Sequence, residues 1–219
     1  MGIEIDLLKN YPKTKRDIKD RGEKKTDEDR RIARQFGKEF FDGDRKQGYG
    51  GFHYNSRFWQ PVIPDLIEHF NIKAGDSLLD VGCAKGFMLY DLLECNSDVV
   101  VAGVDISEYA IENSKEEIKP FLQVANATSL PFKDNSFDIV TSITTVHNLE
   151  KEELAIALQE IERVSKRGSF ITVDAYENDE EREALEAWVL TAKTIMHVDE
   201  WKSFFREVGY TGDYYWFRP

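Results

Sequence analysis

The sequence predicts an α/β fold, a Rossmann-like, mostly parallel sheet with helices on both faces and an N-terminal helical cap. From Asp76 onward, apolar segments of strand length alternate with amphipathic segments of helical length. Strands connected through helical crossovers run parallel, and their sheet is covered on both sides. The segment DVVVAGVD is apolar almost throughout, as expected for a strand that is buried on both faces.

The alternation continues to near the end of the chain. We expect strands at residues 77–81, 99–105, 121–125, 137–143 and 169–174, and helices at 87–94, 109–118, 151–164, 180–192 and 199–208. Only a short aromatic stretch follows the last helix, and we expect Tyr214, Tyr215 and Trp216 to lie at the sheet edge rather than in a pocket. The far edge is therefore expected to be shortened, or to be completed by a partner chain in a homodimer.

The first part of the chain has a different pattern. We expect residues 1–60 to form a helical and aromatic cap, and residues 61–219 to form the core of the same single domain. Thr26 followed by Asp29 predicts a helix start, and Gly43 is the expected end of that helix. The stretch GYGGFHYNSRFWQP then mixes glycines with five aromatic side chains. It is expected either to close over a ligand or to fix the cap to the core.

Composition excludes several classes of function. The net charge is −12, from 29 Lys and Arg against 41 Asp and Glu, which disfavours nucleic-acid partners. The chain has no apolar run long enough to span a membrane and no signal-peptide layout at its start. Its two cysteines, Cys83 and Cys95, are too few for a disulfide framework or a zinc site. We therefore expect a cytoplasmic protein that acts on a small molecule without a metal.

A glycine turn follows the first strand in SLLDVGCAKGFML. Gly82 and Gly86 stand where open parallel sheets bind ligands, but the middle glycine of a dinucleotide fingerprint is replaced here. Asp105 ends the second strand 23 residues after Gly82, a spacing at which an acid binds ribose hydroxyls. Asn126 follows the third strand, where its amide would face an adenine edge, and Asp80 adds a second carboxylate. This pattern favours an uncharged nucleoside with a cationic or zwitterionic tail over a diphosphate.

The segments LLDVGCAKGFML, VAGVDIS, ANATSLPFKDNSFDIV and TSITTVHNL resemble, in order and spacing, the class I S-adenosylmethionine-dependent methyltransferases. The resemblance covers about residues 62–174 and is poor in the flanks. It implies S-adenosyl-L-methionine as cofactor and S-adenosyl-L-homocysteine as product. It also implies a set of cofactor-binding positions: Asp80, Gly82, Cys83 and Gly86 at the methionine end, Asp105 at the ribose, and Ile106, Asn126 and Ala127 at the adenine. The family more often has Asp where Asn126 stands, and Asn keeps an acceptor oxygen.

The methyl acceptor requires its own residues. If it is a hydroxyl, a base should remove its proton, and candidates lie after the fourth and fifth strands. His147 is the first candidate for that base, and Asp174 would orient it or bind a substrate hydroxyl. His53 is a second base candidate if the aromatic segment folds over the site, and Tyr49 in the same segment would contact the sulfonium cation. Each of these side chains would also be unremarkable as a packing residue or a helix cap.

The sequence therefore predicts a methyltransferase that acts on a small molecule, with a sugar or glycan-precursor hydroxyl as the first candidate acceptor. A nitrogen acceptor on a small metabolite is the alternative within the same class. Two rivals come from other classes: a nicotinamide-dependent oxidoreductase, and a catalytically silent binding protein on the same fold. The oxidoreductase is disfavoured because no Tyr-x-x-x-Lys pair occurs from the first predicted strand onward. Intact Asp80, Gly82, Gly86 and Asp105 argue that cofactor binding is retained.

Overall fold

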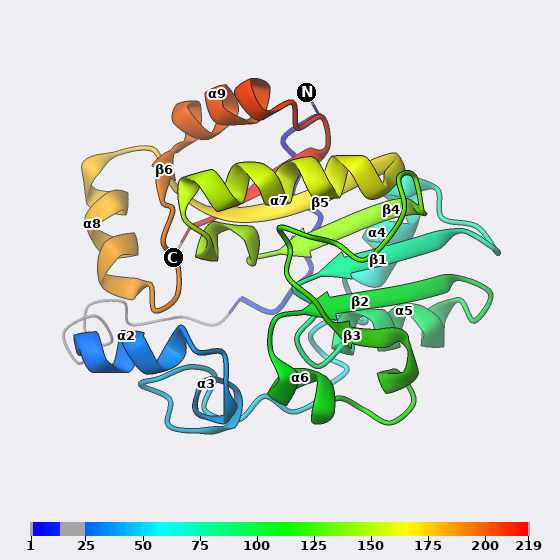
Figure 1. Cartoon of the computed structure of the whole chain (residues 1–219), viewed down its shortest axis with the longest axis horizontal. Helices are drawn as coiled ribbons and strands as arrows, with labels where there is room; N and C mark the ends of the chain where they lie inside the picture. The colour runs from blue at the N-terminus through cyan, green and yellow to red at the C-terminus, as the bar shows by residue number, and fades with distance from the viewer. Residues whose placement is uncertain (1, 14–24, 219) are drawn as a thin grey trace.

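The computed structural model describes residues 2–13 and 25–218, and its centre is a parallel sheet. The strand order is β3-β2-β1-β4-β5-β6, with β7 also paired to β5, and every strand pairing is parallel. The strands are β1 (Ser77–Val81), β2 (Val100–Asp105), β3 (Leu122–Val124), β4 (Phe137–Ile143), β5 (Ser165–Tyr176), β6 (Met196–His197) and β7 (Asp213–Phe217). The predicted α/β class with a mostly parallel sheet is confirmed (Figure 1).

Helices cover both faces of this sheet. The helices are α2 (Asp27–Ala33), α3 (Lys38–Asp42), α4 (Ile63–Phe70), α5 (Phe87–Cys95), α6 (Glu108–Glu112), α7 (Lys151–Val164), α8 (Asp179–Trp188) and α9 (Val198–Val208), with 3-10 turns η1 (Lys119–Phe121) and η2 (Val146–Asn148). Buried residues of α4 and α5 belong to one apolar cluster, and those of α7 and α9 belong to another. The arrowheads of β1, β2 and β4 point to the side where α2, α3 and α8 lie (Figure 1).

The sheet is buried on both faces because neighbouring residues of a strand point in opposite directions. In β1, Leu78 joins the cluster under α4 and α5, and Leu79 joins the cluster under α7 and α9. Ile139 and Val140 of β4 divide in the same way. This two-sided burial explains why the strands are continuous apolar runs in the sequence.

Several element boundaries agree with the sequence and others do not. The structure confirms the predicted bounds of β1, β4 and α7, whereas β5 extends beyond both predicted ends. The helix predicted over residues 109–118 ends at Glu112, where Asn113 and Ser114 side chains bind carbonyls of the preceding turn. The helix that begins after Thr26 stops at Ala33, and Phe36, with φ of +50°, separates it from α3. The capping box formed by Thr26 and Asp29 is present as expected.

The far edge of the sheet is short. β6 contains two residues and pairs with Ala175 and Tyr176 at the end of β5, while β7 pairs with the preceding part of β5. The N-terminal segment adds to this edge, because the backbone N–H of Ile5 donates to the Tyr214 carbonyl and the Tyr214 N–H donates to the Ile3 carbonyl. Within the described residues, none of the helices has the length and apolar character needed to cross a membrane.

Candidate active site

A cavity of about 650 Å³ opens at the carboxyl ends of the strands. Its floor is formed by residues at or just after the carboxyl ends of β1, β2, β3, β4 and β5, which is where parallel sheets place their ligand sites. Its other walls come from the cap and from residues 188–193, between α8 and β6. Most of the predicted site residues line it: Tyr49, Asp80, Gly82, Cys83, Asp105, Ile106, Asn126, Ala127, His147 and Asp174. Gly86 and His53 do not.

Glycine is required at two positions of the turn after β1, for a different structural reason at each. Gly82 has φ of +83°, and a Cβ at this position would lie 2.1 Å from Cγ2 of Thr145, so close packing against β4 excludes any side chain. Gly86 begins α5 with φ of +72°, and its missing Cβ makes room for Leu122. Between them Ala84 also has a positive φ of +49°, which L-residues rarely adopt. Gly82 shapes the cavity, and Gly86 shapes the packing behind it.

Asp105 ties the two neighbouring turns together. One carboxylate oxygen accepts the Ala84 backbone N–H at 2.8 Å, and the other accepts the Ser107 backbone N–H at 2.8 Å. Burial nevertheless raises the pKa of the Asp105 carboxyl. Each carboxylate oxygen has a second lone pair, so the group is held in position and still able to accept hydrogen bonds from a diol. Beside it the apolar Ile106 side chain is 54% exposed in the cavity wall.

Asp80 lies deeper in the same floor. Its Oδ1 accepts a hydrogen bond from Thr141 Oγ1 at 2.8 Å, and none of the basic side chains that the structure describes pairs with it. Burial raises the pKa of Asp80 to about 7, and the neighbouring Asp105 contributes in the same direction. Lys85, the basic residue of the glycine turn, instead pairs with Asp42 of the cap at 2.6 Å. The cavity floor is therefore an anionic environment that suits a cationic group.

His147 and Asp174 form a buried pair at the ends of β4 and β5. The His147 Nδ1 accepts the Asp174 backbone N–H at 3.3 Å, and its Nε2 lies 3.6 Å from Asp174 Oδ2. Burial lowers the pKa of His147 and raises the pKa of Asp174. These partners assign a neutral ring with its proton on Nε2, facing the carboxylate. The pair can therefore hold or accept a proton within the cavity.

The cap supplies an aromatic wall that the sequence indicated only in part. Phe36, Phe40, Phe41, Tyr49 and Phe52 all line the cavity, and the Tyr49 and Phe52 ring centroids lie 4.4 Å apart. His53, in the same segment, is exposed and lies outside the lining. The helical spacing of Phe36 and Phe40 was a visible signal, but a sequence pattern does not show which ligand such side chains face.

Asp42 anchors this wall to the cofactor-side turns. It accepts hydrogen bonds from Lys85 Nζ, from the Tyr109 hydroxyl and from the Phe52 backbone N–H. The Ser107 hydroxyl donates to the Phe36 carbonyl, which adds a second link. The cap therefore rests on the turn after β1 and on the loop after β2.

The segment between α8 and β6 closes the remaining side. The backbone N–H groups of Lys193 and Thr194 both donate to the His147 carbonyl at 3.0 Å. The Arg34 guanidinium reaches the Ala192 carbonyl from the cap at 3.4 Å. The helix predicted over residues 180–192 ends at Trp188, and residues 189–192 line the cavity outside the helix.

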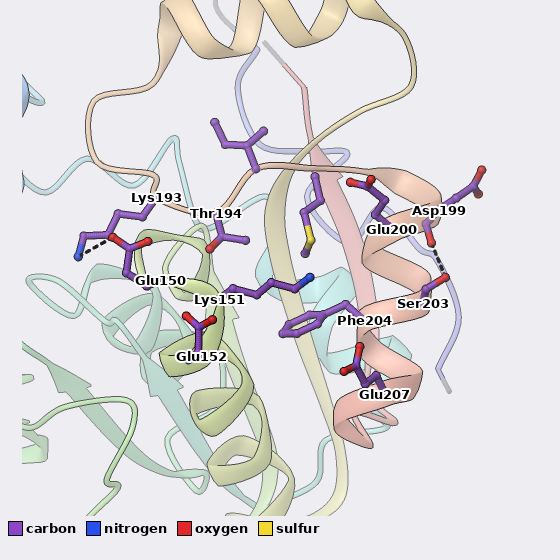
Figure 2. A pocket seen from close by; sticks show the side chains of 12 residues that line it. Glu150, Lys151, Glu152, Lys193, Thr194, Asp199, Glu200, Ser203, Phe204 and Glu207 are labelled. Atoms are coloured by element: carbon purple, nitrogen blue, oxygen red, sulfur yellow. Dashed lines mark hydrogen bonds and ion pairs between the residues drawn. The ribbon is translucent and has the colours of Figure 1, made fainter.

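A second hollow, of about 640 Å³, lies between the start of α7 and α9 (Figure 2). Its lining is rich in carboxylates and includes the Glu150–Lys193 ion pair of 3.5 Å and the Ser203 hydroxyl that donates to the Asp199 carbonyl. No glycine turn and none of the predicted cofactor positions border it. Among residues 2–13 and 25–218, no group of three or more His, Cys, Asp or Glu side chains is arranged to hold a metal ion.

Comparison with known proteins identifies the core. Residues 79–173 match the family described as "Methyltransferase domain". The demethylmenaquinone methyltransferase of Symbiobacterium thermophilum is 35% identical over 126 residues, which cover 53% of this chain and 49% of that protein. The tRNA (carboxymethyluridine(34)-5-O)-methyltransferase of Arabidopsis thaliana is 31% identical over 154 residues, covering 68% of this chain and 36% of the relative. The chain thus spans about half or less of the length of these relatives.

The fold is also found among solved structures. The YcgJ protein from Bacillus subtilis matches with a TM-score of 0.55 and 21% identity, over 67% of this chain and 66% of that chain. At this identity the match shows the fold alone. The residues matched by the family, 79–173, include Asp80 and Asp105 and end directly before Asp174.

Proposed function

We propose that this chain is a class I S-adenosylmethionine-dependent methyltransferase that methylates a hydroxyl group of a small molecule. One observation carries the proposal. The cofactor-side residues Asp80 and Asp105 and the buried His147–Asp174 pair line the same cavity, although they come from three different strands and the turn η2. A cavity of this size is typical of small-molecule sites.

The residues present fit the cofactor. The lone pairs left on Asp105 suit the two ribose hydroxyls, and the exposed Ile106 side chain offers an apolar surface to adenine. Asp80 supplies a carboxylate for the amino group of the methionine portion. When bound, S-adenosylmethionine supplies an electrophilic methyl group on a sulfonium. The aromatic wall around Tyr49 would then face that cation and exclude water.

The His147–Asp174 pair is proposed to take the proton of the acceptor hydroxyl. The neutral ring keeps its proton on Nε2, toward Asp174, so the carboxylate with its raised pKa is the stronger candidate for the proton-accepting group. His147 then orients that carboxylate, because its Nδ1 is held by the backbone of β5. This assignment exchanges the roles that position alone suggested for the two residues. A positioned base of this kind typically contributes about 10²–10⁴-fold to a rate.

The acceptor is proposed to be a small molecule with a sugar-like or glycan-precursor hydroxyl. The acceptor-side walls contain both polar and aromatic side chains, a lining that can orient a small polar ligand. The relatives act, by their names, on acceptors as different as a quinone and a tRNA, so they do not select one. The net charge of −12 disfavours a polyanionic RNA as the methyl acceptor.

Two measurements test the function. Calorimetric titration with S-adenosylhomocysteine should show one site per chain, and Asp105→Ala should weaken it by about tenfold or more. Transfer of a labelled methyl group from S-adenosylmethionine to a panel of hydroxyl-bearing and amine-bearing metabolites should then identify the acceptor. Binding without turnover on any acceptor would favour a catalytically silent protein, and labelling at nitrogen would replace the hydroxyl assignment.

A further inference from the structure

The charges that line the cavity are separated by location. Its three carboxylates, Asp80, Asp105 and Asp174, all stand at strand ends. Its cations, in contrast, all lie in the cap or in the segment after α8, and they are Lys25, Arg34, Arg45 and Lys193. The cavity therefore has an anionic floor on the cofactor side and a cationic wall on the acceptor side.

Within the described residues, two of these cations have no carboxylate partner. Arg34 donates to the Ala192 carbonyl, Arg45 donates to the Tyr49 carbonyl, and neither has a carboxylate partner within the described part of the chain. Arginines away from the cavity commonly pair with acids in this structure, as do Arg30, Arg31, Arg163, Arg167, Arg182 and Arg218. Both side chains are exposed, so a ligand that enters the cavity can reach their charges.

The backbone carbonyls position these guanidiniums without neutralising them. A guanidinium carries five N–H donors, and a single carbonyl contact leaves the others for a ligand. Arg34 begins in the cap and reaches the segment after α8, so it lies where the two acceptor-side walls meet. Arginine is the side chain best suited to bind a carboxylate or a phosphate through paired hydrogen bonds.

We propose that the methyl acceptor carries an anionic oxygen group, a phosphate or a carboxylate, which Arg34 and Arg45 bind. This inference rests on the proposed function and specifies its substrate class. The surface as a whole repels anions because of its net charge, so a local cationic wall both admits the acceptor and sets its orientation. With the anionic group at the cap, a hydroxyl elsewhere on the same molecule is left to face the His147–Asp174 pair at the floor.

The test is binding of simple anions to the protein saturated with S-adenosylhomocysteine. Inorganic pyrophosphate and uridine diphosphate represent a phosphate-bearing acceptor, and succinate represents a carboxylate-bearing one. Calorimetric titration at low ionic strength should show binding of at least one of these probes, weakened by added salt. Stronger binding of pyrophosphate and uridine diphosphate identifies a phosphate acceptor, and stronger binding of succinate identifies a carboxylate acceptor.

Substitutions locate the site. Arg34→Gln or Arg45→Gln should lower the affinity for the anion by about tenfold or more, with unchanged affinity for S-adenosylhomocysteine. Arg57→Gln is the matched control, because Arg57 is exposed, lacks a carboxylate partner and lies outside the cavity. Thermal unfolding of each variant checks that it is folded.

Two results would overturn the inference: no probe binds to the wild-type protein, or both cavity variants bind the anion as well as Arg57→Gln does. Its failure is distinct from failure of the proposed function. Loss of S-adenosylhomocysteine binding by the wild-type protein would remove the methyltransferase itself. Intact cofactor binding without anion binding would remove only the anionic acceptor.

Discussion

A single substitution in the ion pair between Asp42 and Lys85 is expected to destabilise the protein strongly, because both side chains are largely buried. The Lys85 side chain is 4% exposed and Asp42 is 17% exposed, and the two charged atoms lie 2.6 Å apart. In Asp42→Asn the buried ammonium loses the ion-pair partner that the described residues give it, and the new amide N–H₂ faces the donors of Lys85 and Tyr109. Removing one partner of a buried pair costs about 3–5 kcal/mol.

That cost is large enough to measure by thermal unfolding. For a domain of this size each kcal/mol lowers Tm by about 2–4 °C, so Asp42→Asn should lower it by about 6–20 °C. Asp44→Asn is the matched control, since Asp44 is exposed and accepts only the Lys46 backbone N–H. The double variant Asp42→Asn, Lys85→Met should recover much of the loss, because it removes the stranded charge.

The pH dependence of the unfolding free energy independently checks that the ionised Asp42 carboxylate is stabilising. The hydrogen bonds of Lys85, Phe52 and Tyr109 lower the pKa of Asp42 from 3.8 to about 2 despite the opposing effect of burial. A lowered carboxyl pKa contributes stability above the unfolded-state value and loses it as pH falls from about 4 to about 2. The difference in unfolding free energy between wild type and Asp42→Asn should therefore narrow below pH 4. A variant that melts within 1 °C of wild type at pH 7, or a double variant no more stable than the single one, would refute the reasoning.

Three further predictions follow from the cavity floor. Because burial raises the pKa of Asp80 to about 7, affinity for S-adenosylhomocysteine should fall as pH drops from 8 to 6, and calorimetry on Asp80→Asn should show a flatter profile. Gly82→Ala should destabilise the protein by about 1–3 kcal/mol more than Gly75→Ala, because their φ values of +83° and +85° are alike but only Gly82 has a clashing neighbour. Equal decreases in the free energy of unfolding of the two variants, measured in urea, would contradict that steric argument. Asp174→Asn and His147→Gln should each lower kcat by about 10²–10⁴-fold with little change in cofactor affinity, and unchanged turnover in both would remove the proton-transfer role.

The cofactor side of the site could be predicted because each of its residues adjoins a strand end. A parallel sheet brings the ends of β1, β2, β3 and β4 to one edge, whatever the helices do. Asp80, Asp105 and Asn126 therefore converge on a cavity that the chain order already implied. Gly86 is the exception, because a glycine that starts a helix and one that faces a ligand have the same sequence signal.

The acceptor side could not be predicted in the same way, since it depends on contacts between segments far apart in the chain. The helix expected to run to Gly43 breaks at Phe36, whose carbonyl accepts the Ser107 hydroxyl from the loop after β2. The place of Arg34 in the cavity wall depends on its hydrogen bond to the carbonyl of Ala192, which lies 158 residues away. Local periodicity carries no information about such pairings, so the cationic wall and the full extent of the aromatic wall appear only in the folded chain.

These long-range links also join the two halves of the site mechanically. Asp42 connects the cap to Lys85 in the cofactor turn, and Ser107 connects the cap to the loop that Asp105 holds. A cofactor that orders these two loops therefore also fixes the base of the wall that carries Arg34 and Arg45. Loosening that base by Asp42→Asn should consequently weaken anion binding more than cofactor binding, because the floor residues are held by the sheet and the wall is held by the cap. A larger loss of anion binding than of cofactor binding would show that the cap forms part of the acceptor site. The opposite result would show that the cap only covers the core.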